Sequence, residues 1–326
     1  MPFDIKIMDW AQINLDELAE TAWESRLASP LWVNGQSVDQ FKSFIVQSKD
    51  RWPESLAVVA YRNGELVGWL ALITDDPLAF ELWRWHPFIK PGEDRDLIAD
   101  QLLQACKRIT AEKGGQSLEV CCHLQKEQLN SEIESYLQIQ GSWYERNGLE
   151  LSDETVYMTC SSSEIDLPPT PTFPEPYSIC RYHPQLKTTL YEVYLQAFTA
   201  GQDRSFLNKT PAGVKAQFDR YLEGELNHQA SIVLMRGGQP IGLSLVQSRE
   251  EVGDEHLALI AVIPRYQRQG WGRKLLNASM LTSTQAGEKL FSLGVDLTNT
   301  PAYTLYRSLG FEAQTKLVTH IWKNDS

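Results

Sequence analysis

The run Gln267-Arg268-Gln269-Gly270-Trp271-Gly272 contains residue types that can bind an anion through the main chain. It follows an apolar stretch, residues 257–263, that is typical of a buried strand and that Pro264 closes. The helical pattern after it puts these residues on one side: Leu275, Leu276, Ala278, Ser279 and Met280. Glycines let an anion approach the free amides of a helix's first turn, where the helix dipole favours negative charge. The sequence therefore predicts a pyrophosphate cradle.

A second motif lies downstream, in residues 293–311. Val295 belongs to an alternating strand pattern, and Asn299 with Pro301 marks a helix start. The helical spacing then continues to a glycine, Gly310, through Ala302, Leu305, Tyr306 and Leu309. The predicted order is strand, turn, helix and glycine stop.

Together the two motifs resemble the Gcn5-related N-acetyltransferase (GNAT) superfamily over about residues 177–326. The resemblance implies an α/β domain with a mixed, mainly antiparallel central sheet flanked by helices, and acetyl-coenzyme A as cosubstrate. Val262 and Ile263 would end the strand that pairs with pantetheine, and Asn299 would complete the site. The implied pyrophosphate loop consists of Arg268, Gln269, Gly270, Trp271, Gly272 and Arg273.

Acyl transfer to an amine also needs an acid and a way to stabilise an oxyanion. Backbone amides near Val262 are suited to hold the oxyanion. Tyr306 is the predicted general acid, because a tyrosine hydroxyl near the sulfur can protonate the departing thiolate. The alternative for Tyr306 is packing of a helix on the sheet, and for Asn299 it is helix capping without ligand contact.

The general base is not identified by the sequence. Many members of the superfamily carry an acidic residue where this chain has Leu259, and the branch that acetylates peptide N-termini carries a glutamate where it has Gly294. The remaining candidates could equally be solvated surface residues: Asp254, Glu255, His256 and Asp296. A water relay, or an amine that binds already neutral, would need no dedicated base.

The rest of the chain resembles a second copy of the same domain, and 326 residues favour two cores. Residues 55–68 and 231–242 both predict a hairpin with an Asn-Gly or Gly-Gly turn. Residues 80–87 match 257–264, residues 90–98 match 268–276, and residues 144–149 match 306–311. We expect a degenerate N-terminal domain (1–160), a proline-rich linker (161–176) and a catalytic C-terminal domain (177–326).

The N-terminal copy differs in its loop. Glu93 and Asp94 occupy the places of Trp271 and Gly272, and carboxylates there would repel a pyrophosphate. A core helix is still expected from Leu97, Ile98, Leu102, Leu103 and Ala105. This domain is expected to pack on the C-terminal domain and shape its acceptor pocket, or to be a structural remnant.

Helices are expected around residues 190–198 and 216–222, with a loop at 202–209 between them. In the superfamily this segment tends to contact the acceptor. Asp203, Arg204 and Phe206 are therefore candidate substrate contacts by position, and a plain surface loop is the alternative.

The composition limits the classes of partner and of site that the protein is expected to have. A formal net charge of −12 disfavours nucleic acid and anionic membranes as partners and is compatible with a cationic amine. No apolar run is long enough to span a bilayer, and the start lacks a secretory pattern, so a cytoplasmic location is expected. The five cysteines are expected to be reduced core thiols, and no metal site is expected from the scattered histidines.

The main functional prediction is transfer of an acetyl group to the primary amine of a small molecule. The tandem layout and Asp296 are similar to mycothiol synthase and its relatives, which acetylate the amine of a cysteinyl pseudodisaccharide. Two alternatives stay open. One is a peptide or protein N-terminus as acceptor, and the other is a non-catalytic acyl-coenzyme A sensor.

Overall fold

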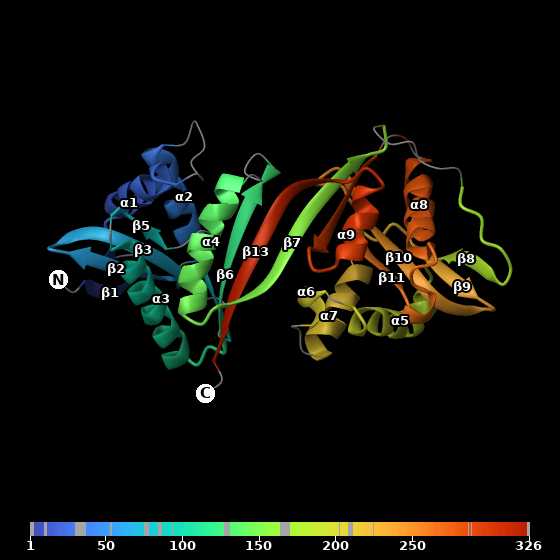
Figure 1. Ribbon diagram of the computed structural model, residues 1–326, viewed down its shortest axis with the longest axis horizontal. Helices are drawn as coiled ribbons and strands as arrows, with labels where there is room; N and C mark the ends of the chain where they lie inside the picture. Colours follow the sequence, from blue (N-terminus) through green and yellow to red (C-terminus); the bar gives the residue numbers. More distant parts are fainter. Residues whose placement is uncertain are drawn as a thin grey trace. The chain divides into compact units, whose positions relative to one another are not determined.

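A computed structural model describes residues 3–9, 12–29, 37–52, 54–74, 78–83, 87–92, 94–126, 131–163, 170–201, 203–207, 211–223, 225–285, 287 and 289–324. The chain is a mixed α/β protein, as predicted (Figure 1). It divides into two compact units. Unit 1 comprises residues 1–153 with 317–326, and unit 2 comprises residues 154–316.

Unit 1 contains the elements β1 (Asp4–Asp9), α1 (Leu15–Leu27), α2 (Val38–Arg51), β2 (Leu56–Arg62), β3 (Glu65–Ile73), β4 (Ala79–Leu82), β5 (Phe88–Ile89), α3 (Arg95–Glu112), β6 (Ser117–Gln125) and α4 (Ser131–Arg146). Strands β1 to β4 pair antiparallel in chain order, and β4 then pairs parallel with β6. Helix α3 connects the two parallel strands, because a parallel pair needs a long crossover.

Unit 2 contains β8 (Tyr177–Arg181), the 3₁₀ turn η3 (Pro184–Leu186), α5 (Lys187–Thr199), α6 (Arg204–Leu207), α7 (Pro211–Leu222), β9 (Ile232–Arg236), β10 (Gln239–Arg249), β11 (Asp254–Val262), the 3₁₀ turn η4 (Pro264–Tyr266), α8 (Trp271–Thr284), β12 (Leu290–Asp296) and α9 (Thr300–Arg307). Strands β8 to β11 pair antiparallel, and β11 pairs parallel with β12. Helices α5 and α8 pack on opposite faces of β10 and β11 (Figure 1). The order of elements repeats that of unit 1.

Both predicted hairpins are confirmed. The turn between β2 and β3 has φ values of 52° at Asn63 and 85° at Gly64. The turn between β9 and β10 has 54° at Gly237 and 80° at Gly238. Two successive positive φ angles match the right-handed twist of the flanking strands, which explains the Asn-Gly and Gly-Gly choices.

Each unit includes a strand segment from the other half of the sequence. β7 (Glu150–Ser161) pairs with β12 of unit 2 through residues 155–161, whereas β13 (Glu312–Lys323) follows β6 in the strand order. Val318 of β13 accordingly belongs to the unit 1 core. The compact units therefore differ from the predicted contiguous segments, since residues 317–326 join unit 1 and residues 154–160 join unit 2. Residues 164–169 of the predicted linker lie outside the described residues, and 170–176 form no helix or strand.

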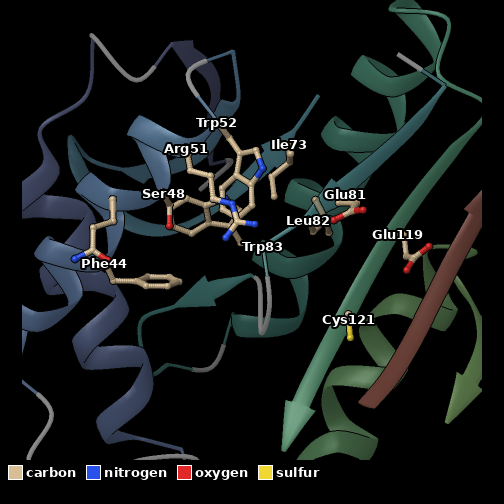
Figure 2. Close-up of a pocket in the computed structure, with 11 residues that line it drawn as sticks. Phe44, Ser48, Arg51, Trp52, Ile73, Glu81, Leu82, Trp83, Glu119 and Cys121 are labelled. Atoms are coloured by element: carbon tan, nitrogen blue, oxygen red, sulfur yellow. The ribbon is translucent and has the colours of Figure 1, made fainter. Parts of the chain in front are cut away.

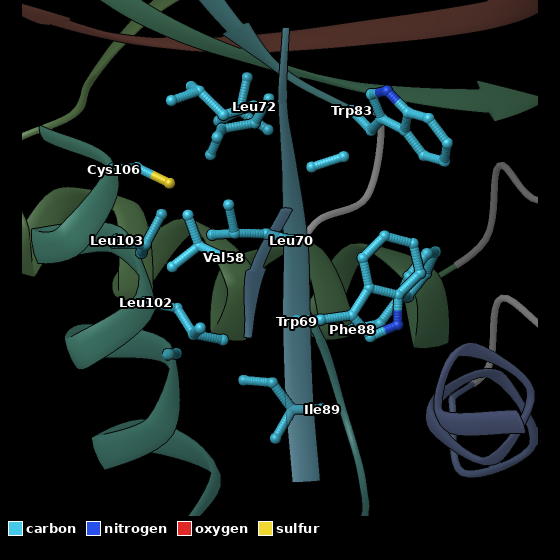
Figure 3. Close-up of a cluster of buried hydrophobic side chains, with 14 of the residues drawn as sticks. Val58, Trp69, Leu70, Leu72, Trp83, Phe88, Ile89, Leu102, Leu103 and Cys106 are labelled. Atoms are coloured by element: carbon cyan, nitrogen blue, oxygen red, sulfur yellow. The ribbon is translucent and has the colours of Figure 1, made fainter. Parts of the chain in front are cut away.

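The unit 1 core surrounds β2 and β3 (Figure 3). Val58 and Leu70 lie toward α3, whereas Trp69 and Phe88 lie on the other side of the sheet. The predicted core face of α3 is confirmed except at Leu97, which is 49% exposed because its position on the helix points away from the sheet. The prediction of core thiols is wrong for Cys180, which lies exposed on β8, the last strand in the order of its sheet.

Candidate active site

The glycine loop has the geometry of an anion cradle. Arg268 and Gly270 both adopt left-handed conformations, with φ of 58° and 82°. Gly270 is the N-cap of α8, and a Cβ built on it would meet no atom within 4 Å. The first amides of a helix have no intrahelical acceptor, and alternating backbone conformations turn such amides toward one concavity. The residues therefore fit a pyrophosphate held by main-chain donors.

The side chains of the loop mainly hold its shape. Trp271 is buried, with its ring 4.3 Å from that of Tyr177, so its indole packs in the core instead of facing a ligand. Gln269 accepts from Trp271 Nε1 at 3.3 Å and donates to the Arg265 carbonyl at 3.3 Å. Trp271 and Gln269 can therefore contact an anion only through their main-chain groups. Arg268 and Arg273 are exposed and supply positive charge beside the loop.

The parallel strands beside the loop separate. β11 and β12 pair from Asp254 with Leu290 to Leu257 with Leu293, and the pairing ends there. Beyond it, β11 continues on β10 as far as Val262, and β12 continues on β7 as far as Asp296. A register shift between Leu245 and Val246 of β10 falls opposite the same point, as expected for a bulge that bends a strand.

This separation turns main-chain groups of β11 toward the gap. Ile263 N donates to the Ile241 carbonyl at 3.0 Å on the β10 side, so the alternation of the ladder turns Val262 N toward the β12 side. The Val262 carbonyl accepts from Gln267 Nε2 at 2.8 Å. Val262 can thus offer its amide to an oxyanion or to pantetheine, and Gln267, which sequence reasoning did not single out, fixes the strand end.

Tyr306 lies on α9 and is 5% exposed, with its ring 6.0 Å from that of Phe311. Burial, and secondarily the charge of Asp203, raises the pKa of its hydroxyl above the usual range. The hydroxyl therefore stays protonated at neutral pH and can act as a donor. Asn299 accepts from Ala302 N at 3.3 Å, which confirms that it caps α9.

The predicted loop at 202–209 contains the short helix α6, with residues 202, 208 and 209 outside the described residues. Phe206 is buried against Tyr194 and Phe198, which favours a packing role, and its contact with substrate stays a prediction. The alternative of a plain surface loop is wrong for Phe206, because this apolar ring anchors the segment to α5.

Asp203 remains a candidate contact for the acceptor. Its charge is the second cause, after burial, of the raised pKa of Tyr306. The same two causes, burial first, raise the pKa of Tyr221 to about 12. Its carboxylate accepts from Phe206 N at 3.1 Å. The structure therefore brings one carboxylate near the predicted acid.

Comparison with known proteins agrees with this geometry. Residues 188–311 match the Acetyltransferase (GNAT) family. This segment of unit 2 is a GNAT domain. A solved GCN5-related N-acetyltransferase from Sphaerobacter thermophilus is 16% identical, with a TM-score of 0.53 over 98% of this chain and 95% of that one. The glucosamine N-acetyltransferase region of a fungal multi-domain β-N-acetylglucosaminidase is 13% identical, with a TM-score of 0.54 over 98% of this chain and 38% of that one. These two likenesses show the fold.

A curated N-alpha-acetyltransferase from Sulfurisphaera tokodaii is 38% identical over 69 residues. That match spans 21% of this chain and 40% of the relative. The similarity therefore concerns only part of each protein.

Three of the four candidate bases in the GNAT domain are buried, so the alternative that they are solvated surface residues is wrong for them. Asp296 accepts from Thr298 N at 2.8 Å, Thr298 Oγ1 at 2.7 Å and Arg204 N at 2.8 Å. Glu255 accepts from Asn227 Nδ2 at 2.9 Å and Ser248 Oγ at 3.0 Å. Asp296 thereby links β12 to α6, and Glu255 links β11 to β10, which is a structural role.

Asp254 is also committed to a network. It forms an ion pair with Arg249 and accepts from the Tyr157 hydroxyl at 2.9 Å. Burial alone would raise the pKa of Asp254, but the hydrogen bonds from Arg249, Ser292 and Tyr157 outweigh it and lower the pKa. This carboxylate is ionised and accepts hydrogen bonds from three donors, which suits a positioning role.

His256 is the fourth candidate. Its Nδ1 lies 2.9 Å from Ser292 Oγ, and its ring stacks on Tyr157 with an interplanar angle of 14°. Burial, with the charge of Arg249 second, lowers the pKa of His256 to about 4, so the ring is neutral at neutral pH. It stands one residue before Leu257, where the separation of β11 and β12 begins.

Among the described residues, no group of three or more His, Cys, Asp and Glu side chains is placed to hold a metal ion. No helix in the described part of the chain is long and apolar enough to cross a membrane.

Proposed function

We propose that the GNAT domain transfers an acetyl group from acetyl-coenzyme A to a primary amine of a small molecule. The observation that carries the proposal is the joint placement of three features: the left-handed loop before α8, the gap between β11 and β12, and the buried, protonated Tyr306. An ordinary strand-to-helix turn supplies only the left-handed loop, whereas acyl transfer needs all three features.

Each residue has a distinct task in this proposal. The amides of residues 270–273 hold the pyrophosphate, and Val262 N stabilises the negative charge that develops on the carbonyl oxygen. As the amine nitrogen bonds to the carbonyl carbon and the carbon–sulfur bond breaks, the Tyr306 hydroxyl donates its proton to the departing sulfur. Asn299 sets the start of the helix that carries Tyr306.

His256 is proposed as the base. With Nδ1 donating to Ser292 Oγ, Nε2 is left to accept, through a chain of water molecules, the proton that the amine nitrogen gives up as it bonds to the carbonyl carbon. The neighbouring Gly294, which pairs with Tyr157, is exposed, so this face of the sheet is open to an acceptor. The neutral ring satisfies the requirement that a base be unprotonated before reaction.

Asp203 supports a cationic acceptor, because a carboxylate near Tyr306 favours an ammonium there. A peptide N-terminus is the second candidate, favoured by the 38% identity to an N-alpha-acetyltransferase. An acyl-coenzyme A sensor without turnover is the third. Acetyl-coenzyme A is made in the cytoplasm, so we propose that the protein works there.

The test begins with calorimetric titration of acetyl-coenzyme A, followed by thioester cleavage assays against amines and peptide N-termini. The variant Tyr306→Phe should bind acetyl-coenzyme A normally and lose about 10²–10⁴-fold in kcat, since only the proton donor is removed. Tyr303→Phe on the same helix is the matched control and should keep its activity. Unchanged turnover in Tyr306→Phe would overturn the acid assignment, and no turnover with any acceptor would favour the sensor.

A further inference from the structure

Polar side chains from four neighbouring strands of unit 2 form one hydrogen-bonded network. They are Tyr157, Arg249, Asp254, His256 and Ser292. His256 and Ser292 are register partners on the parallel strands β11 and β12, and Arg249 and Asp254 are register partners on β10 and β11. The strand ladders therefore set which of these side chains meet.

The hydroxyl of Ser292 lies at the centre of the network and is fully buried. Its Oγ lies 2.9 Å from His256 Nδ1, and Arg249 Nη2 donates to it at 2.9 Å. Ser292 also forms a hydrogen bond with the carboxylate of Asp254. A hydroxyl has one proton and two lone pairs, so these three contacts use its whole hydrogen-bonding capacity.

Two of the three neighbours determine the direction of each bond to Ser292. A guanidinium can only donate, so Ser292 accepts from Arg249. Burial opposes ionisation of Asp254, but its hydrogen bonds outweigh burial and lower its pKa, and an ionised carboxylate can only accept. The single proton of Ser292 therefore goes to Asp254. The lone pair that remains faces His256 Nδ1, which must carry a hydrogen to complete the bond.

We propose that Ser292 and Asp254 are positioning residues that fix the tautomer of His256, with the hydrogen on Nδ1 and with Nε2 unprotonated. In a neutral imidazole one nitrogen donates and the other accepts, so the bond at Nδ1 decides the role of Nε2. If Ser292 donated to Nδ1 instead, Nε2 would carry the hydrogen and could not act as a base. The consequence for catalysis rests on the proposed role of His256 in acyl transfer.

The rest of the network holds the carboxylate and the imidazole in place. Arg249 Nε donates to Asp254 Oδ1 at 2.8 Å, and the Tyr157 hydroxyl donates to Asp254 Oδ2 at 2.9 Å. The ring of Tyr157 also stacks on that of His256 at an interplanar angle of 14°. Both carboxylate oxygens and the plane of the imidazole are therefore fixed, as a positioning role requires.

The equivalent strands of unit 1 carry different residues at these positions. In the match between the two halves, Ala79 of β4 stands where β11 has His256, and the register partner of Ala79 is Ser117 of β6. The next polar pair along these strands, Glu81 and Glu119, lines a pocket of about 450 Å³ in unit 1 (Figure 2). An alanine cannot accept a proton, so the proposed arrangement belongs to the GNAT domain.

The test reads the tautomer from the nitrogen NMR shifts of the histidine rings in the full chain at neutral pH. Loss of one set of signals in His256→Gln identifies those of His256. The wild-type protein should show a hydrogen on Nδ1 and none on Nε2. A wild-type ring with its hydrogen on Nε2 overturns the proposal, and this result needs no variant of the network to fold.

Removal of the serine hydroxyl tests its role. Ser292→Ala should shift the His256 signals toward a mixture of both tautomers and lower kcat about 10–100-fold, with the KM for acetyl-coenzyme A unchanged. Ser292→Thr keeps a hydroxyl and should restore both the tautomer and kcat. Ser244→Ala on β10 removes another buried hydroxyl, which bonds to Ser279, and should change neither. An unchanged tautomer in Ser292→Ala refutes the proposal.

Asp254→Asn tests the carboxylate. An amide nitrogen can donate to Ser292, which releases the serine proton for His256 Nδ1, so this variant should also populate the tautomer with the hydrogen on Nε2. A ring that keeps its hydrogen on Nδ1 in Asp254→Asn would contradict the role of Asp254.

The two measurements separate this inference from the proposed base. Full activity in His256→Gln, together with a wild-type hydrogen on Nδ1, would refute His256 as the base and confirm that Ser292 and Asp254 set its tautomer. Loss of activity in His256→Gln, together with a wild-type hydrogen on Nε2, would support His256 in catalysis and refute the positioning role.

Discussion

At the scale of single residues, burial sets opposite protonation states on two side chains of the GNAT domain. Tyr306 keeps its proton because burial raises the pKa of the phenol, and His256 is neutral because burial lowers the pKa of the imidazole to about 4. At neutral pH the phenol therefore carries its proton and the imidazole is unprotonated. A pair of environments that separates two titrations in this way is typical of acid–base sites.

His256→Gln should lower kcat by about 10²-fold and leave acetyl-coenzyme A binding unchanged, because the amide cannot accept the amine's proton. The same variant also tests the lowered pKa of His256, because that pKa makes the free energy of unfolding depend on pH. Folded His256 releases its proton near pH 4 and the unfolded residue near 6.5, so the unfolded chain binds more protons between those values. Stability should therefore fall as the pH drops through this window.

The contribution of His256 to that loss is about 2 kcal/mol between pH 7 and 5, and the Gln variant should lack it. Urea unfolding of both proteins at the two pH values measures the difference. Identical pH dependence in the two proteins would show that burial does not disfavour the charged ring.

At the scale of elements, the loop before α8 differs from the equivalent turn before α3. Gly270 caps α8 with a positive φ, whereas Asp94 caps α3 with φ of −94° and forms an ion pair with Arg62. Glu93, the other predicted carboxylate, lies outside the described residues. We propose on this ground that one acetyl-coenzyme A binds per chain, in the GNAT domain.

Gly272→Glu should abolish acetyl-coenzyme A binding with little change in melting temperature. A carboxylate in the first turn stabilises a helix through its dipole, but it repels the pyrophosphate. Gly272→Ala is the control, since a Cβ there would meet Leu305 at an ordinary 3.6 Å. Calorimetric titration should show at least about a hundredfold loss for Glu and near-normal affinity for Ala. Retained affinity in the Glu variant would mean that another loop binds the cosubstrate.

At the scale of the whole molecule, each unit includes a strand segment from the other half of the sequence. The end of β13 packs in unit 1, where Val318 is buried and the Asn324 amide donates to the Gln116 carbonyl at 2.8 Å. The ring of His320 lies 5.0 Å from that of Tyr144. The stability of unit 1 therefore depends on residues more than 160 positions away from its other elements.

A chain that ends at Lys316 should accordingly lose stability in unit 1, by several kcal/mol, because buried side chains and a strand partner are removed together. A chain that ends at Asn324 keeps these contacts and should melt like the full protein. Thermal unfolding followed by far-ultraviolet circular dichroism compares them. Equal melting temperatures would show that β13 is dispensable for unit 1.

The sequence by itself determined the local features of this protein. The hairpin turns at Asn63 and Gly237, the left-handed Gly270 and the capping Asn299 follow from backbone preferences of residues a few positions apart. The buried face of α8 follows from its 3.6-residue period. Each of these depends on interactions within one turn or one hairpin, so the sequence order alone specifies it.

Only the tertiary structure decided the environment of the candidate base and the partners of the last strands. Asp254 meets Tyr157 across 97 residues, and this contact exists because β7 lies beside β12. Neither the pattern of β7 nor that of β13 says which sheet edge it joins, since any half-buried strand can pair with either. The protonation of His256 follows from that pairing, because a pKa depends on every group packed around the ring and not on its neighbours in the chain.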